Sequence, residues 1–493
     1  MLRTRAFLLA PVALAGFPVE AWCEPQADLG PSIVVQSASP WREVDWRAVR
    51  NQQLTWEPVE SSPLPESTPP PEEATAPTTR KRRAKPQPLD DVFALNEYIG
   101  PTIGVPDTTP IYPLNEALWD AIPALKDADI RVYGWVNPSV GFSSSRESNF
   151  PLSYNVQSNS VMFNQGVIRV ERPVDTVQTD HWDVGFRATM MYGSDYRFTT
   201  AKGMFSNQLL NNNQLYGFDP VELYAQVYIP EVADGMVLTL GRYISPADIE
   251  AQTSPSNLLF THSLMFTVDP YTFTGVKADI KLDDNWSMMF QVHGGNDVVV
   301  PDKASRLNGG AMVRWVSDDN NDSIWAGVNA INGSNYNVGS DQLNHFVGTW
   351  SHKFNDDVNM MTEVYYEYFR NGLTGGRVNY GPPISAYRLT GPGTPIPGEA
   401  GALGIVSYTN FKVSDQSYFT FRADYLNDPV GMRTGFGTAF GSLTLGYTHR
   451  FSPLITIRPE IRYEKAFRAG VTPYDNGRRA DQTSFSMDAI LRF

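Results

Sequence analysis

The C-terminal segment of the chain is the sequence feature that most restricts its fold. Residues 483–493, TSFSMDAILRF, alternate apolar and mostly polar side chains up to the last residue, Phe493. Because successive side chains of a β-strand point to opposite faces, this pattern predicts a two-faced strand that reaches the end of the chain. A terminal strand with a bare apolar face promotes aggregation unless another sheet or lipid covers that face.

The same alternation recurs along most of the chain. Clear examples are VELYAQVYI at 221–229, SLTLGYTHRF at 442–451 and LITIRPEIRYEKA at 454–466. In the last of these, the face opposite the apolar one carries a ladder of opposite charges, made of Arg458, Glu460, Arg462 and Glu464. A soluble sandwich turns its polar face to bulk water. A dense ladder with equal numbers of opposite charges instead favours a water-filled barrel interior, in which opposite charges lie near each other.

The connections between the expected strands alternate between short and long. We expect strands near 130–142, 164–172, 180–192, 219–230, 235–243, 270–282, 285–294, 308–317, 323–332, 344–354, 358–370, 401–411, 416–427, 438–451, 454–466 and 482–493. Short connections include 283–284, 355–357 and 452–453, and long ones include 193–218, 244–269 and 371–400. Short periplasmic turns and long outer loops are typical of outer-membrane barrels. The sequence therefore predicts an all-β fold, a transmembrane antiparallel β-barrel of about 16 strands.

Aromatic residues in the outward phase gather near both ends of these strands. Near the short turns they include Trp182, Trp286, Phe451 and Phe493, and near the long loops Tyr192, Tyr366 and Tyr425. A barrel embedded in lipid needs such a belt at each interface. Chains of this class resemble one another in ending on an aromatic residue, which implies that Phe493 is the signal recognised by the barrel-assembly machinery.

The N-terminal part of the chain differs in composition from the strands. We expect a signal peptide at 1–21 with cleavage after Ala15 or Ala21, a Pro-rich disordered periplasmic segment at 22–89, a linker with a short amphipathic helix at 90–129, and the barrel at 130–493. The helix is predicted by PLNEALWDAIPAL, whose apolar residues recur at helical spacing until Pro123 interrupts them. The single cysteine, Cys23, excludes an intramolecular disulfide.

Several kinds of chemistry have no sequence signal here. The formal net charge of −14 argues against nucleic acid as a partner. The chain shows no nucleotide-binding loop, no zinc-ligand spacing and no nucleophile elbow. We therefore expect no enzyme, no cofactor and no metal site.

Three segments carry a resemblance to a known family. NQLYGFDPVELYAQVYIP at 213–230, LGRYISPADIEAQTSP at 240–255 and DPYTFTGV at 269–276 resemble the OmpL-like β-barrel porin family of Gram-negative outer membranes. The resemblance covers roughly residues 90–493. It implies a porin-like barrel but no particular substrate.

The expected barrel predicts a function in transport. A barrel of about 16 strands leaves an aqueous bore, which favours an outer-membrane porin for passive diffusion of small hydrophilic solutes. A structural or surface-interaction barrel with an occluded lumen is the alternative. The expected partners are outer-membrane lipid and lipopolysaccharide, the barrel-assembly machinery and small hydrophilic solutes. The sequence leaves open whether the protein is a monomer or forms a homo-oligomer. The charged residues expected to line the channel are Lys277, Asp279, Arg422, Asp424, Arg458, Glu460, Arg462 and Glu464.

The connection at 244–269 is unusually apolar for an exposed loop. It contains LLF at 258–260 and LMF at 264–266, which would be costly to leave in water. We expect this connection to fold against something. An inward fold would make it a constriction loop, with Asp248 and Glu250 opposite basic wall residues such as Arg458 and Arg462. Packing on the rim or against a neighbouring subunit is the alternative.

Overall fold

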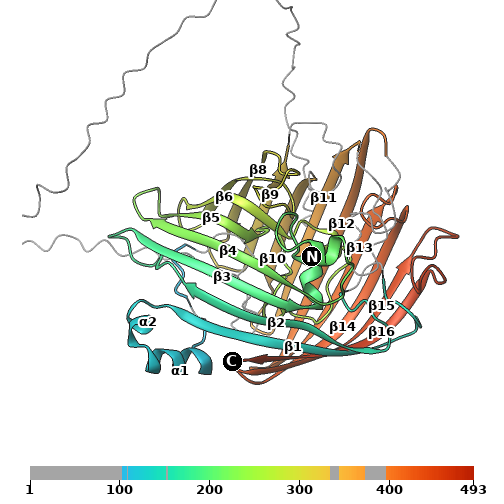
Figure 1. The fold of residues 1–493 in the computed structure, drawn as a ribbon, viewed down its shortest axis with the longest axis horizontal. Helices are drawn as coiled ribbons and strands as arrows, with labels where there is room; N and C mark the ends of the chain where they lie inside the picture. Colours follow the sequence, from blue (N-terminus) through green and yellow to red (C-terminus); the bar gives the residue numbers. More distant parts are fainter. Residues whose placement is uncertain (1–102, 108, 151–153, 333–342, 372–395) are drawn as a thin grey trace, which may run out of the picture. The chain divides into compact units, whose positions relative to one another are not determined.

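The computed structural model describes residues 103–107, 109–150, 154–332, 343–371 and 396–493. Within these residues, 16 antiparallel strands hydrogen-bond to their sequence neighbours and form a closed barrel (Figure 1). The first strand, β1 (Arg131–Ser143), pairs with the last, β16 (Asp481–Arg492). The predicted all-β barrel of about 16 strands is confirmed.

The strands between these two follow the predicted segments closely. Their bounds are β2 Ser160–Arg172, β3 Asp183–Gly193, β4 Gly217–Ile229, β5 Met236–Ile244, β6 Thr272–Lys281, β7 Trp286–His293, β8 Asn308–Val316, β9 Asp322–Ile331, β10 Asn344–Lys353, β11 Val358–Arg370, β12 Glu399–Ser414, β13 Ser417–Asp428, β14 Thr438–Ser452 and β15 Ile455–Ala466. Short and long connections alternate as predicted. The largest difference is at the start of β2, which lies four residues before the expected 164. The next largest are three residues each, at the start of β3 (183 rather than 180) and at the end of β12 (414 rather than 411).

Closure depends on backbone pairing at the C-terminus. The Phe493 N–H donates to the Gly134 carbonyl at 2.9 Å, and the Gly134 N–H donates to the Phe493 carbonyl at 3.0 Å. The register shifts at Asn137 and Pro138, where proline has no N–H to give to the ladder. With β1 and β16 joined, the sheet has no open edge, which is what a bilayer requires of a β-structure.

The two faces of the wall differ as the alternation predicts. Leu443, Leu445 and Ile461 are exposed on the outside, together with the aromatic side chains of Trp182, Trp286, Phe451, Tyr192, Tyr366 and Tyr425. The inward set is buried and charged, and it includes Arg458, Glu460, Arg462 and Glu464. The wall therefore presents apolar surface to lipid and charge to the lumen.

Two short helices precede the barrel. The helix expected over 113–125 is present as α1 (Pro113–Ala121) and α2 (Pro123–Asp127), separated at Ile122 just before the proline. Asn115 accepts a hydrogen bond from the Val132 N–H at 2.7 Å, which fixes α1 to the start of β1. No helix in the part of the chain that the structure describes is long and apolar enough to cross a membrane. The predicted signal peptide, the Pro-rich segment at 22–89 and Cys23 lie outside the described residues.

The close approach at the closing strand pair predicts a sensitive position. A Cβ at Gly134 would lie 2.1 Å from the Val167 carbonyl oxygen and 2.9 Å from the Phe493 ring. We expect Gly134→Ala to destabilise the folded barrel by ~1–3 kcal/mol, the usual cost of overpacking. Gly348→Ala is the matched control, since its Cβ would meet its nearest neighbour, Ala326, at an ordinary 3.5 Å. Thermal unfolding in detergent measures both, and equal melting temperatures would contradict the prediction.

Candidate functional site

The connection between β5 and β6 lies inside the barrel. We call residues 245–271 the lumen segment. All of its residues are buried except Pro246, Pro255 and Ser256, which are half-buried. Its hydrogen bonds reach wall residues across the lumen, including Gln165 on β2, Trp325 on β9 and Thr448 on β14.

The apolar residues of the lumen segment pack on apolar wall residues. Leu258, Leu259, Leu264, Met265 and Val268 belong to one buried cluster with wall side chains such as Met312, Met361, Tyr365, Val406 and Tyr418. Two wall glycines allow close contact, because a Cβ at Gly446 would lie 2.3 Å from Leu259 and one at Gly404 would lie 2.6 Å from Met265. This packing accounts for a composition that would be costly in an exposed loop.

The wall arginines hold the lumen segment through its backbone. Arg458 donates to the carbonyls of Ser254 at 3.0 Å and Asn257 at 2.7 Å, and Arg462 donates to the His262 carbonyl at 2.7 Å. The expectation that Asp248 and Glu250 face Arg458 and Arg462 is wrong. Both arginines have carboxylate partners on the wall, namely Asp488 and Glu464, so they meet carbonyl oxygens of the segment rather than its carboxylates.

Glu250 pairs with a different arginine. Its Oε1 lies 3.6 Å from Arg422 Nη1, and it accepts hydrogen bonds from the Ser263 N–H at 2.9 Å, the Ser263 hydroxyl at 2.6 Å and the Tyr408 hydroxyl. Burial raises the pKa of Glu250, although the positive charge of Arg422 opposes that rise. Burial also lowers the pKa of His262 well below its usual value, and the nearby arginines lower it further.

Wall carboxylates bind the N–H groups of the same segment. Glu363 accepts from Ile249 at 2.8 Å, and Asp424 accepts from Leu264 at 2.9 Å. Glu460 accepts from Phe260 and Thr261, both at 3.1 Å. Hydrogen bonds to a charged acceptor are stronger than neutral ones. The charged side chains of the wall thus bind the backbone of the lumen segment.

An open cavity lies beside the part of the wall that the lumen segment covers. Its volume is about 590 Å³. It is lined by residues of β1 to β6, by Trp325 on β9 and by five residues that precede α1, namely Ile103, Val105, Pro106, Asp107 and Thr109. Ion pairs stand along it, including Arg187 with Glu171 at 2.7 Å and Lys277 with Asp279. The cavity is thus polar and carries both signs of charge.

The eight residues predicted to line the channel fall into two groups. Lys277 and Asp279 line the cavity. The other six are buried on the side where the lumen segment packs, and they are Arg422, Asp424, Arg458, Glu460, Arg462 and Glu464. Strand phase identified all eight as inward-facing, but it contains no information about which inward residues another segment covers.

Comparison with known proteins decides the family. The family model "Putative beta-barrel porin-2, OmpL-like" matches residues 129–493. The chain belongs to this family. The match begins within two residues of the start of β1 and ends at the C-terminus, so it spans the whole barrel of this OmpL-like porin.

Several solved structures are similar to this OmpL-like porin, and no curated protein matches it. The outer membrane channel DcaP of Acinetobacter baumannii is 10% identical with a TM-score of 0.46, and the match covers 74% of this chain and 97% of that chain. The anion-selective porin from Comamonas acidovorans is 10% identical with a TM-score of 0.47 and coverages of 74% and 99%. OmpT of Vibrio cholerae is 11% identical with a TM-score of 0.45 and coverages of 74% and 97%.

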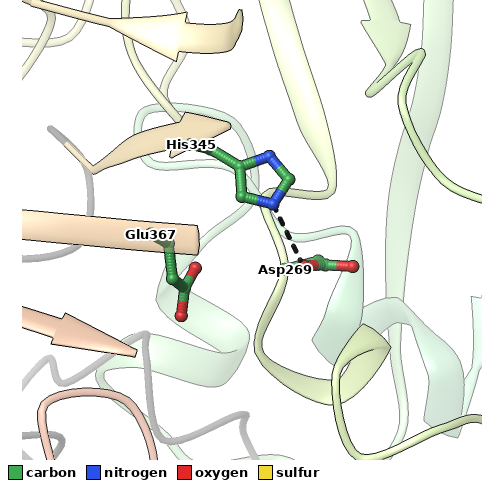
Figure 2. Close-up of side chains that lie close together, drawn as sticks. All are labelled: Asp269, His345 and Glu367. Carbon is green, nitrogen blue, oxygen red and sulfur yellow. Dashed lines mark ion pairs between the residues drawn. The ribbon is translucent and has the colours of Figure 1, made fainter. Parts of the chain in front are cut away.

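Sequence reasoning missed one group of residues in this OmpL-like porin. Asp248, Asp269 and Glu363 form one close group, and Asp269, His345 and Glu367 form a second (Figure 2 shows the second). Burial raises the pKa values of Asp248 and Asp269 well above their usual range, and neighbouring carboxylates raise them further. Asp248 was expected as a constriction residue. The members of the two groups are far apart in the chain and fit no metal-binding spacing, so no local pattern indicated that they meet.

Proposed function

We propose that this OmpL-like porin allows passive diffusion of small hydrophilic solutes across the outer membrane, along the cavity beside the lumen segment. The observation that carries the proposal is the open polar cavity of about 590 Å³ inside a closed barrel. Paired charges such as Arg187 with Glu171 and Lys277 with Asp279 give the cavity wall no strong excess of either sign. We therefore expect weak charge selectivity.

The alternative is a structural or surface-interaction barrel with an occluded lumen. Its support is the extent of the lumen segment's packing. The buried apolar cluster of the segment includes wall residues from β7 to β15, and the segment's hydrogen bonds reach β1 and β2. The two functions predict the same fold and differ in whether solutes cross. Conductance of the purified protein in a planar bilayer separates them, because only an open lumen gives discrete ion-conducting steps.

A charged thiol reagent maps the path. Gln226 lines the cavity, whereas Gln482 is buried against Glu464 through a 2.6 Å hydrogen bond. In a Cys23→Ser background, we expect modification of Gln226→Cys to lower single-channel conductance, because the added group narrows the cavity. Gln482→Cys is the matched control and should remain unmodified. A conducting channel that responds equally at both positions would place the solute path elsewhere.

We propose that the lumen segment acts as the constriction of the channel, with Asp248 and Glu250 as its charged residues. Residues 248–264 carry these two carboxylates and no lysine or arginine. Deleting them should enlarge conductance, because the segment then no longer fills its side of the lumen. It should also shift selectivity toward anions, because the deletion removes the acidic partner of Arg422 and uncovers Arg458 and Arg462.

A small deletion elsewhere controls for this change. Ala469 and Gly470 lie in the exposed connection between β15 and β16, so removing them should leave conductance and selectivity as they are in the unaltered chain. A correctly folded 248–264 deletion with unchanged conductance would remove Asp248 and Glu250 from the constriction.

We further propose that the short turns and the N-terminal segment face the periplasm. Transmembrane barrels place their short turns on that side. In the Cys23→Ser background, a membrane-impermeant maleimide on intact cells should label Ala469→Cys in a long connection. It should not label Asp356→Cys, which lies in the short connection between β10 and β11. Labelling of the second position alone would mean that the barrel has the inverted orientation.

The remaining predicted properties follow from the same proposal. The exposed apolar outer face would contact outer-membrane lipid and lipopolysaccharide, and Phe493 would be the signal for the barrel-assembly machinery. Association with further copies of the chain remains a prediction, as does the expectation that the protein is not an enzyme. None of these changes how the cavity would conduct solutes.

A further inference from the structure

Four carboxylates and one imidazole meet at one buried place in the lumen. Ligand atoms of Asp269, His345 and Glu367 lie within 4.8 Å of one another, and so do those of Asp248, Asp269 and Glu363. Asp269 belongs to both groups and joins them. Figure 2 shows the carboxylates of Asp269 and Glu367 near the His345 ring, with His345 Nε2 3.6 Å from Asp269 Oδ1.

These side chains are buried and largely unsatisfied. None of the five is more than 2% exposed. Among the residues that the structure describes, both carboxylate oxygens of Asp269, one oxygen each of Asp248 and Glu367, and Nε2 of His345 have no hydrogen-bond partner, while the other oxygen of Glu367 faces Arg433. Buried polar atoms are nearly always paired. Five such atoms in two adjoining groups are an independent sign that something binds there.

The local charges are also unbalanced. Among the described residues, one guanidinium lies beside the four carboxylates, that of Arg433, whose Nε lies 2.9 Å from Glu367 Oε1. Glu250, the next carboxylate along the lumen segment, is paired with Arg422. Unpaired buried anions are strongly unfavourable. The cluster therefore requires either shared protons or a bound cation.

We propose that Asp269, His345 and Glu367 bind one divalent first-row transition metal ion such as Mn²⁺ or Zn²⁺, beside the second group formed by Asp248, Asp269 and Glu363. Carboxylates suit Mn²⁺ and also Ca²⁺ and Mg²⁺, whereas an imidazole nitrogen suits transition metals. The mixed set of oxygen and nitrogen ligands thus favours the transition metals. A divalent ion and Arg433 together offset three of the four negative charges.

The surroundings of His345 fit the role of a ligand. Its second ring nitrogen, Nδ1, lies 3.2 Å from the side-chain amide of Asn329. Metal-bound histidines usually donate their other N–H to a neighbouring oxygen. In the structure the Asn329 amide nitrogen faces Nδ1, and the Asn329 amide oxygen accepts from Gln291 at 3.2 Å. Rotation of this amide on metal binding would let Nδ1–H donate to its oxygen and leave the Nε2 lone pair for the metal.

The position of the cluster gives the ion a structural role. Asp248 and Asp269 lie near the two ends of the lumen segment, while His345 is on β10 and Glu363 and Glu367 are on β11. The ion would therefore tie one end of the segment, through Asp269, to a part of the wall that is not adjacent to β5 and β6, while Glu363 accepts the Ile249 N–H near the other end. This role affects how the channel conducts, but ion binding itself does not depend on the proposed diffusion function.

Metal analysis of the full chain tests the proposal. Lipopolysaccharide binds divalent cations, so the protein should be refolded in detergent without it, treated with EDTA and dialysed against MnCl₂ or ZnCl₂. We expect mass spectrometry to find about one ion per chain, and we expect the metal to raise the melting temperature. Solution EPR of the Mn²⁺-loaded protein should show a protein-bound Mn²⁺ ion and no free hexaaquo Mn²⁺.

Variants identify the ligands. Asp269→Asn with Glu367→Gln should lose the bound ion and the rise in melting temperature, and His345→Gln should weaken Zn²⁺ binding. Asp219→Asn is the matched control, because Asp219 is an equally buried carboxylate that pairs with Arg242 at 2.9 Å. Binding by that control should match the unaltered chain.

Two results would overturn the proposal. The first is a folded, unaltered chain that binds neither Mn²⁺ nor Zn²⁺ at stoichiometric level, which would leave shared protons as the state of the cluster. The second is a folded cluster variant that retains the full amount of ion, which would place the ion elsewhere. Neither result decides whether solutes cross the barrel, because the conductance experiment tests that proposal separately.

Discussion

Closure of the sheet is the constraint on which the rest of the structure depends. Within a bilayer, an unpaired backbone N–H or C=O group costs several kcal/mol, so a sheet with open edges is not viable there. Pairing of β1 with β16, completed by the mutual hydrogen bonds of Gly134 and Phe493, removes both edges. Once the sheet is closed, every second side chain must face lipid and the others must face the lumen.

That division places a large number of charges inside the barrel. Each charge needs a partner, because burial without one is unfavourable. Arg458 has Asp488 and Arg462 has Glu464 on the wall, and both also bind carbonyls of the lumen segment. The segment in turn buries its apolar side chains between these polar contacts. The wall and the lumen segment therefore stabilise each other.

The lumen is consequently asymmetric. On one side the lumen segment covers the wall, and its carboxylate cluster around Asp269 is the place where charge pairing is incomplete. On the other side, the walls of β1 to β6 leave a polar cavity with paired charges. The same wall chemistry thus has two uses, which are holding an internal segment and bordering an open cavity.

The sequence by itself determined the barrel. Alternation of side chains is a local property of an extended backbone, so the number of strands, their approximate bounds and the inward direction of residues such as Arg458 and Lys277 could be predicted from spacing alone. The apolar composition of 244–269 also indicated that this connection folds against something. Only the tertiary structure decided where that segment lies, that Glu250 meets Arg422, and that Asp269 meets His345 and Glu367. Those contacts join residues of different strands across a closed lumen, and no local pattern specifies the path of a connection through that space.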